Sequence, residues 1–291
     1  MYKYYGKKVP YLFLLPAAVV LILFFFIPFF KTIGLSFFDY SSNIYHAGFA
    51  GFKNYIDILH NPIFYKVMLN TLIYLVVAVP ILAIVPLFLA ILINQKIRGI
   101  TLYKILIYLP VIVSIVVAAI AFKWLYAGQG ILNYALSLFN IKSIGWLTDP
   151  NWALFSVAVV TIWKGIGYYM MIYLASLMSV PQDLYEACDI DGAGFFRKHL
   201  TVTIPHIMPT IALVSTISTI SAMKVFAEIY VMTKGGPLNS TKTIVYYIYE
   251  RAFENLDLGY ASALAVVLLI VVMIFSLINI LFFEKGKYGD I

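Results

Sequence analysis

Long apolar runs alternate with polar connections along this chain. Six runs are long enough to be predicted as helices that cross a bilayer: Tyr11 to Phe30, Leu69 to Ile93, Ile105 to Trp124, Trp152 to Met178, Pro205 to Glu228, and Tyr260 to Phe283. An α-helix rises about 1.5 Å per residue, so about 20 apolar residues match a hydrocarbon core that is roughly 30 Å thick. The pattern therefore predicts an all-α polytopic integral membrane protein with six transmembrane helices.

The connections between the runs refine this picture. After the first run the chain continues KTIGLSFFDY, without a small-x-small cleavage site, which favours an uncleaved first transmembrane helix over a signal peptide. The polar and aromatic stretch from Leu35 to Met68 is predicted to be a loop with a short interfacial helix near Phe52 to Leu59. Pro80 and Pro86 fall inside the second run, where they predict a kink.

Composition agrees with a membrane protein. Of the 291 residues, 63% are hydrophobic and only 11% are charged, and one soluble core cannot bury that much apolar surface. The single cysteine, Cys188, excludes an intrachain disulfide. The formal net charge of +7 would suggest nucleic acid in a soluble protein, but the chain has no basic patch with interleaved aromatics, so no nucleic-acid partner is expected.

The positive charge is better interpreted as a topology signal. One side of the membrane would hold both termini, the connector Asn94 to Lys104 and the central polar stretch, with Lys3, Lys7, Lys8, Lys96, Arg98, Lys104, Arg197, Lys198, Lys285 and Lys287. The other side would hold Lys53, Lys66, Lys142, Lys234, Lys242 and Arg251, spread over longer loops. By the positive-inside rule, we expect both termini and the central stretch in the cytoplasm, and the loop before Leu69 outside it.

The central stretch from Asp183 to Pro209 carries an ordered polar pattern. Acidic residues come first, where the dipole at a helix N-terminus favours them, and Gly192 stands where a helix needs a left-handed terminator. A short helix is therefore predicted from Gln182 to Ile190. It is too short and too polar to lie in lipid, so it needs a protein partner unless the stretch is only a solvated hairpin between two spans.

Two motifs resemble a known family. The run Glu186-Ala187-Cys188-Asp189-Ile190-Asp191-Gly192-Ala193-Gly194, followed by Ile204-Pro205 and Pro209, resembles the EAA loop of ATP-binding-cassette (ABC) importer permeases. A second pattern resembles the sugar-uptake branch, with its larger maltose-type and its glycerol-phosphate-type membrane subunits: Thr233-Lys234-Gly235-Gly236-Pro237, then Thr241, YYIYERAF from Tyr246 to Phe253, and Gly259 to Ala263. The chain departs from the family pattern at Cys188, where alanine is usual, and at His199, near a position that is often aromatic.

The resemblance implies a type I importer permease (MetI-like) fold. Its core would be residues 69–283, with a cytoplasmic coupling loop at 182–209, preceded by a first helix and extracytoplasmic loop in 1–68 and followed by a cytoplasmic tail in 284–291. In that family the EAA helix docks in a cleft of a cytoplasmic ATPase. The residues expected to couple transport to ATP hydrolysis are Glu186, Ala187, Asp191, Gly192 and Gly194, with Glu186 as the charged anchor.

The resemblance also implies partners. The chain has no GxxxxGK[ST] phosphate loop, so it is not itself the ATPase, and it is expected to be no enzyme. The implied assembly contains a second homologous permease subunit, two ATP-binding subunits and an extracytoplasmic solute-binding protein in the plasma membrane of a prokaryote. No cofactor or metal is expected on this chain, since ATP and Mg²⁺ would act on the partners. The expected cargo is a sugar or oligosaccharide, with glycerol phosphate or a related polyol phosphate as the alternative.

Ionisable groups inside the predicted spans are further candidates, because a charge in hydrocarbon is costly and usually faces a cavity. Lys164 lies near the middle of the fourth span with Trp163 and Tyr168 close by, a combination suited to sugars. Either these residues line a substrate path, or Lys164 pairs with a carboxylate or a backbone carbonyl at the interface with the second permease. Lys224 and Glu228 are four residues apart, so they either form an ion pair or belong to the same path.

Two other classes of protein fit the sequence less well. An ion-coupled secondary transporter usually contains a repeated half, and no internal repeat is evident. An intramembrane enzyme would need a paired nucleophile and base or a metal cluster, but the histidines show no ligand spacing such as HExxH: His46, His60, His199 and His206.

Overall fold

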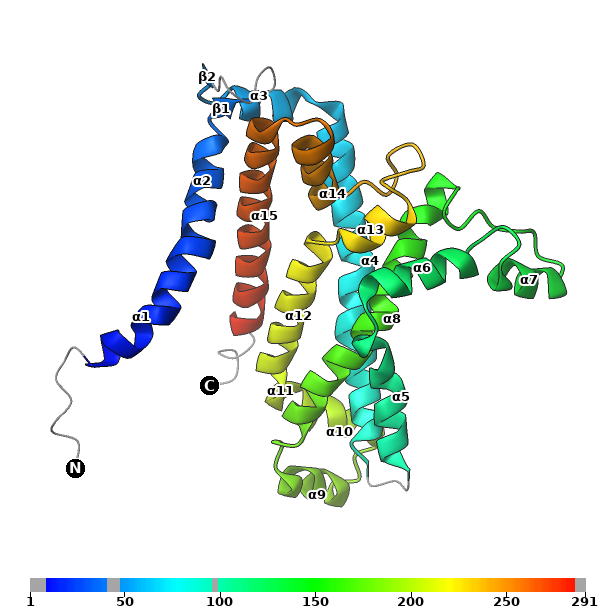
Figure 1. The fold of residues 1–291 in the computed structure, drawn as a ribbon. Coiled ribbons are helices and arrows are strands. Elements are labelled where there is room, and N and C mark those ends of the chain that lie inside the picture. The colour runs from blue at the N-terminus through cyan, green and yellow to red at the C-terminus, as the bar shows by residue number, and fades with distance from the viewer. Residues whose placement is uncertain (1–8, 41–47, 96–98, 286–291) are drawn as a thin grey trace. The chain divides into compact units, whose positions relative to one another are not determined.

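Figure 1 shows the computed structural model of the chain, which describes residues 9–40, 48–95 and 99–285. The chain divides into two compact units, and each is described by itself. Unit 1 contains Met1–Asn61 and Ile248–Ile270, and unit 2 contains Pro62–Tyr247 and Val271–Ile291.

Some of the basic residues from which the orientation was predicted lie outside the described residues, as do residues 286–291 of the predicted tail. These basic residues are Lys3, Lys7, Lys8, Lys96, Arg98 and Lys287.

Unit 1 begins with one long helix. It consists of α1 (Val9–Leu21), a π-helical turn η1 (Ile22–Phe26) and α2 (Ile27–Leu35). Pro28 has no N–H to donate to the carbonyl four residues earlier, which accounts for the wide turn just before it. Every side chain from Tyr11 to Phe30 is exposed, as expected of a surface that faces lipid.

The rest of unit 1 is built on the end of this helix. Strand β1 (Phe38–Asp39) pairs antiparallel with β2 (Gly48–Phe49), with Phe38 opposite Phe49. Helix α3 (Lys53–His60) follows, which confirms the short helix predicted near Phe52 to Leu59. The C-terminal part of the chain adds a π-helical turn η3 (Glu250–Glu254) and the first part of α15 (Leu258–Lys285).

Unit 2 is a helical bundle. Its elements in chain order are α4 (Pro62–Ile93), α5 (Ile100–Ile112), α6 (Ile115–Leu125), α7 (Ile131–Leu138), α8 (Pro150–Leu177), α9 (Gln182–Ile190), α10 (Phe195–Lys198), a π-helical turn η2 (His199–Thr203), α11 (Ile204–His206), α12 (Met208–Met223), α13 (Ala227–Met232), α14 (Ile244–Tyr249), whose end belongs to unit 1, and the part of α15 from Val271 on. Helix α4 packs along α8 and α12 (Figure 1). Tyr74, Tyr173 and Val214 are fully buried between them and belong to one continuous core.

Glycines on α8 allow its neighbours to approach closely. A Cβ at Gly165 would lie 2.7 Å from Cδ2 of Leu82 on α4, so only glycine fits there without a shift. A Cβ at Gly167 would collide with the backbone carbonyl of Ile107 on α5. Helix α8 is therefore packed closely against a side chain of α4 and against the backbone of α5.

Five helices of the described chain are long and apolar enough to cross a membrane: Tyr11–Leu35, Pro62–Ile93, Pro150–Leu177, Met208–Met232 and Leu258–Phe283. They correspond to five of the six predicted spans. The second begins earlier than predicted, at Pro62 rather than Leu69, because proline suits the first turn of a helix. That helix is continuous through Pro80 and Pro86.

Two predicted spans contain a break. The third was predicted as one helix from Ile105 to Trp124. The structure has two helices there, α5 and α6, which meet at 96°, so the prediction of one uninterrupted helix is wrong. Val113 and Ser114 have extended backbones, which cannot continue the helical hydrogen bonds. The pair provides a sixth span only if it crosses the membrane as one bent unit. The fifth span begins at Met208 rather than Pro205 and is interrupted between α12 and α13.

Candidate functional site

The predicted polar helix is present with the expected bounds, as α9 from Gln182 to Ile190. Gly192 follows with a φ of +71°, the left-handed conformation that ends helices and that glycine adopts without strain. The N–H of Ala193 donates to the carbonyl of Cys188 at 2.9 Å, which closes the last turn. The glycine stop predicted from the sequence is therefore confirmed.

Aromatic and hydroxyl side chains hold α9 against the segment that follows it. The hydroxyl oxygens of Tyr185 and Thr203 lie 2.8 Å apart. Nδ1 of His199 lies 2.7 Å from the same Thr203 hydroxyl, and its ring packs edge-on against Phe195. The sequence interpretation missed Tyr185 and Thr203. The one signal for Tyr185 is that it is the only aromatic residue of a polar helix.

Charges reinforce this attachment. Lys198 forms an ion pair with Asp189 of α9. Burial, and then the nearby charge of Lys198, hold the pKa of His199 below its usual value. The neutral imidazole is therefore the form that this packing favours.

The other side of α9 is open to solvent. All five residues expected to couple transport to ATP hydrolysis are exposed: Glu186, Ala187, Asp191, Gly192 and Gly194. Ile190 is 87% exposed beside them. On the inner side, a cleft of about 450 Å³ reaches Asn94 and Gln95, which follow the end of α4. A helix that is fixed from behind and presents an acid, small residues and an isoleucine is suited to docking a protein.

The second sequence motif, from Thr233 to Thr241, forms a loop closed by its own side chains. The hydroxyls of Thr233 and Thr241 lie 2.7 Å apart, and Thr241 also donates to the carbonyl of Gly236 at 2.7 Å. Buried Asn70 of α4 donates to the carbonyl oxygens of Asn239 at 2.8 Å and Lys242 at 3.0 Å. The loop is therefore part of the framework of unit 2.

Lys164 of α8 has a partner inside the chain. Its Nζ donates to the backbone carbonyl of Val111 at 2.8 Å, near the end of α5. Of the two predictions for this residue, the structure supports pairing with a carbonyl, although the carbonyl belongs to this chain and not to a second permease. A lysine at a helix C-terminus also interacts favourably with the helix dipole.

Lys224 and Glu228 do not form the predicted ion pair in the described part of the chain. Helix α12 ends before Lys224, so the two residues do not share one helical face. Glu228, 8% exposed, instead accepts a hydrogen bond from the Thr161 hydroxyl at 2.7 Å, and that hydroxyl lies 2.6 Å from the Tyr74 hydroxyl. Tyr74, Thr161 and Glu228 thus form a buried polar chain between α4, α8 and α13, which the sequence interpretation missed apart from Glu228.

The aromatic candidates on α8 are exposed on the isolated chain. Trp163 packs against Phe122 of α6, and Tyr168 packs edge-on against Tyr169. Trp163, Lys164 and Tyr168 lie on α8, and Lys224 and Glu228 lie at and after the end of α12. That these five residues line one path stays a prediction. Among residues 9–40, 48–95 and 99–285, no group of three or more His, Cys, Asp or Glu side chains is placed to hold a metal ion.

Comparisons with known proteins place these features in a family. The family model described as "Binding-protein-dependent transport system inner membrane component" matches residues 47–284. The probable ABC transporter permease YurN of Bacillus subtilis is 36% identical, over 97% of this chain and 98% of that protein. The lactose transport system permease LacF of Rhizobium radiobacter is 34% identical, over 92% of both chains.

A solved structure agrees with the sequence relatives. A chain of a bacterial ABC transporter involved in the import of the acidic polysaccharide alginate superposes with a TM-score of 0.83 at 25% identity, over 95% of both chains. The fold similarity therefore extends over nearly the whole length of this chain.

Proposed function

Because the chain belongs to the family of binding-protein-dependent transport system inner membrane components, we propose that it is the permease subunit through which an ABC importer moves a sugar or oligosaccharide. Permease subunits of this family are membrane components and not enzymes. The sugar class is supported by the lactose and alginate systems to which the similar permeases belong. The observation that supports the coupling role is the exposed face of α9, whose other side is attached to the next segment through Tyr185 and Thr203.

The proposed assembly contains this chain, a second homologous permease, two ATP-binding subunits with their ATP and Mg²⁺, and an extracytoplasmic solute-binding protein. The alginate transporter to which this fold is similar was also solved with a periplasmic protein that carries an alginate pentasaccharide. We place the multi-pass chain in the plasma membrane of a prokaryote, with both termini and α9 in the cytoplasm.

In the proposed mechanism, α9 transmits movement of the ATPase to the spans. Glu186 pairs with a cationic residue of the ATPase, while Gly192 and Gly194 let the two backbones approach at the bend. The contacts of Tyr185 and His199 with Thr203 make α9 and the entry to α12 move together. ATP-driven closure of the two ATPases would thereby change the packing of α12 against α4 and α8.

In the proposed substrate path, exposed groups contact the cargo and buried groups shape the path. Trp163 and Tyr168 offer aromatic faces for sugar rings, and Lys224 offers a hydrogen-bond donor at the break after α12. Glu228 positions α13 through Thr161, and Lys164 positions α5 through Val111.

The test of the coupling role uses the assembled transporter in vesicles. We expect Glu186→Lys to abolish the stimulation of ATP hydrolysis by cargo-loaded binding protein, because it replaces the anchoring charge with its opposite. Asp183→Lys is the matched control: it makes the same charge change on the same exposed helix, and stimulation should persist. Full stimulation in Glu186→Lys would remove the anchoring role.

The cargo class is tested separately, by uptake into the same vesicles. Oligosaccharides, monosaccharides and glycerol 3-phosphate are offered with the cognate binding protein. ATP-dependent uptake of a sugar supports the proposal, while uptake of glycerol 3-phosphate alone would assign a polyol phosphate instead.

A further inference from the structure

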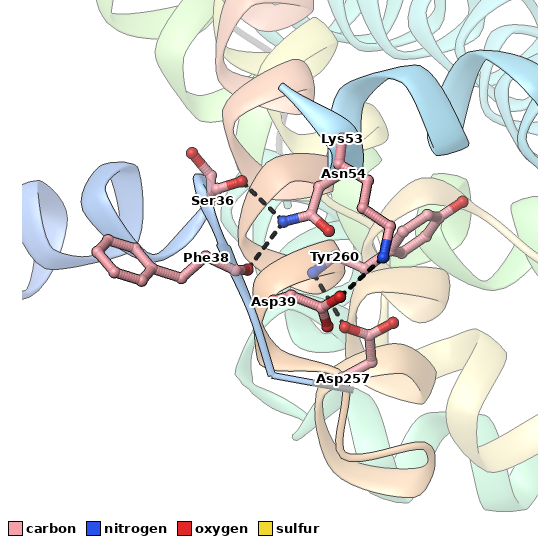
Figure 2. Close-up of polar contacts among 7 residues, drawn as sticks. All are labelled: Ser36, Phe38, Asp39, Lys53, Asn54, Asp257 and Tyr260. Atoms are coloured by element: carbon pink, nitrogen blue, oxygen red, sulfur yellow. Dashed lines mark hydrogen bonds and ion pairs between the residues drawn. The ribbon is translucent and has the colours of Figure 1, made fainter. Parts of the chain in front are cut away.

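Helix α3 is attached to the residue at which the first long helix ends (Figure 2). Asn54, only 6% exposed, donates from Nδ2 to the carbonyl oxygens of Ser36 at 2.9 Å and Phe38 at 3.0 Å. The hydroxyl oxygens of Ser36 and Tyr55 lie 2.7 Å apart. Since Ser36 caps α2, the end of the Tyr11–Leu35 candidate span fixes where α3 lies.

This attachment is compact and multiply supported. Figure 2 shows the Lys53 ammonium group beside the Asp39 carboxylate, at 2.8 Å, next to the Asn54 contacts. A Cβ at Gly259 of α15 would collide with the carbonyl of Phe38, so the two segments meet at backbone distance. The orientation of α3 relative to the end of α2 is therefore held by contacts within unit 1.

The outward face of α3 carries an apolar stripe. Phe52, Ile56 and Leu59 follow an i, i+4, i+7 spacing and are 68%, 54% and 58% exposed. Phe49, in the strand just before α3, is 77% exposed. These four residues are called the α3 stripe.

The rest of α3 has one face buried in the protein and one face of exposed polar residues. Asn54 and Ile58 are buried against the rest of unit 1. The exposed polar residues Lys53, Asp57 and His60 occupy the sector between the buried face and the α3 stripe. A helix with one apolar stripe, one charged sector and one side anchored to the end of a membrane span has the pattern of a helix that lies in the bilayer interface.

We propose that the α3 stripe is a lipid-binding surface that rests in the headgroup boundary of the bilayer and fixes the depth of the first span. The first span, to whose end α3 is attached, has exposed and apolar side chains from Tyr11 to Phe30, as expected of a surface that faces lipid. Phenylalanine and leucine are typical of the apolar face of helices that lie in the membrane interface, and removing apolar area from water lowers the free energy. This role is independent of the cargo and of the coupling helix.

The experiment measures where the stripe lies. A nitroxide spin label is attached to Ile56→Cys or Leu59→Cys in the full chain, assembled with its partners in vesicles of phosphatidylcholine and phosphatidylglycerol. Cys188→Ser is the background, so that no other cysteine takes the label. Asp57→Cys is the matched control, one residue from Ile56 but in the charged sector. Collision rates are measured with oxygen, which concentrates in lipid, and with a water-soluble nickel chelate.

We expect the ratio of oxygen to nickel collisions to be severalfold higher at positions 56 and 59 than at position 57. Equal, water-like ratios at all three positions would show that the stripe faces solvent and would overturn the proposal. Loss of both collision rates at 56 and 59 would show that a protein partner covers the stripe, which would overturn it equally.

Discussion

Lys164 and Gly167 show how single residues depend on a neighbour that the sequence does not identify. The Lys164 ammonium group lies in a membrane-spanning helix, where it needs a partner, and it finds the carbonyl of Val111. That carbonyl is available because α5 ends at Ile112, so no later residue of α5 donates to it. A sequence shows the lysine but not the position of the carbonyl.

Gly167 supports a prediction at the same scale. We expect Gly167→Ala to lower the free energy of unfolding by about 1 to 3 kcal/mol, because the added Cβ would collide with the Ile107 carbonyl and backbone cannot yield as a side chain does. The measurement is the thermal unfolding of the purified chain in detergent. Gly34→Ala in α2 is the control, because a Cβ there meets nothing within 4 Å. Equal transition temperatures for the two variants would contradict the close packing of α8 on α5.

Among the helices, α9 is the element that the sequence predicted best. Its bounds and its glycine stop follow from local rules, because helix dipoles and left-handed glycine act within a few residues. Its attachment to His199 and Thr203 crosses a turn, and the sequence interpretation did not include it. The bend between α5 and α6 was missed because the run is mostly apolar on both sides of it. Two local signals, Pro110 near the end of α5 and Ser114 at the break, were not used in the sequence interpretation.

The lowered pKa of His199 predicts that the attachment of α9 depends on pH. Burial and Lys198 favour the neutral ring, while a loosened segment takes up a proton near the ordinary pKa of about 6.5. The stabilisation is therefore complete above that value and is lost as the pH falls from it toward the lower folded pKa. We expect amide exchange in α9 and α10, corrected for intrinsic rates, to accelerate between pH 7.5 and 5.5.

The control for this prediction is His199→Gln, which retains a hydrogen-bonding side chain without a titrating ring. Exchange in that variant should not change with pH beyond the intrinsic rates. A pH response of the same size in both proteins would exclude His199 as its source.

For the whole molecule, the number of crossings depends on the bent pair α5 and α6. Five helices of the described chain are each long and apolar enough to cross the membrane on their own. The bent pair provides a sixth crossing only if it crosses as one unit. Six crossings are what the proposed orientation requires, since both termini then lie on the same side. The family match over residues 47–284 shows what kind of protein this is, but it does not by itself place each connection.

Thiol labelling tests the crossing directly. In a Cys188→Ser background, we expect Phe139→Cys, in the exposed segment after α7, to react with a membrane-impermeant maleimide added to intact cells. Gln95→Cys, in the connector before α5, should react only after the membrane is opened. Reaction of both positions from the same side would mean that the bent pair enters and leaves the membrane without crossing it.

The sequence by itself determined the membrane class, five of the spans and the short polar helix α9 with its glycine stop. Each of these rests on hydrophobic periodicity or on rules that act over one or two helical turns. The tertiary structure alone decided the 96° bend, the Lys164 partner, the separation of Lys224 from Glu228 and the anchoring of α3 by Asn54. These features depend on which groups from distant parts of the chain come together. An apolar residue is equally suited to a surface that faces lipid and to a contact with another helix, so the apolar pattern does not specify these contacts.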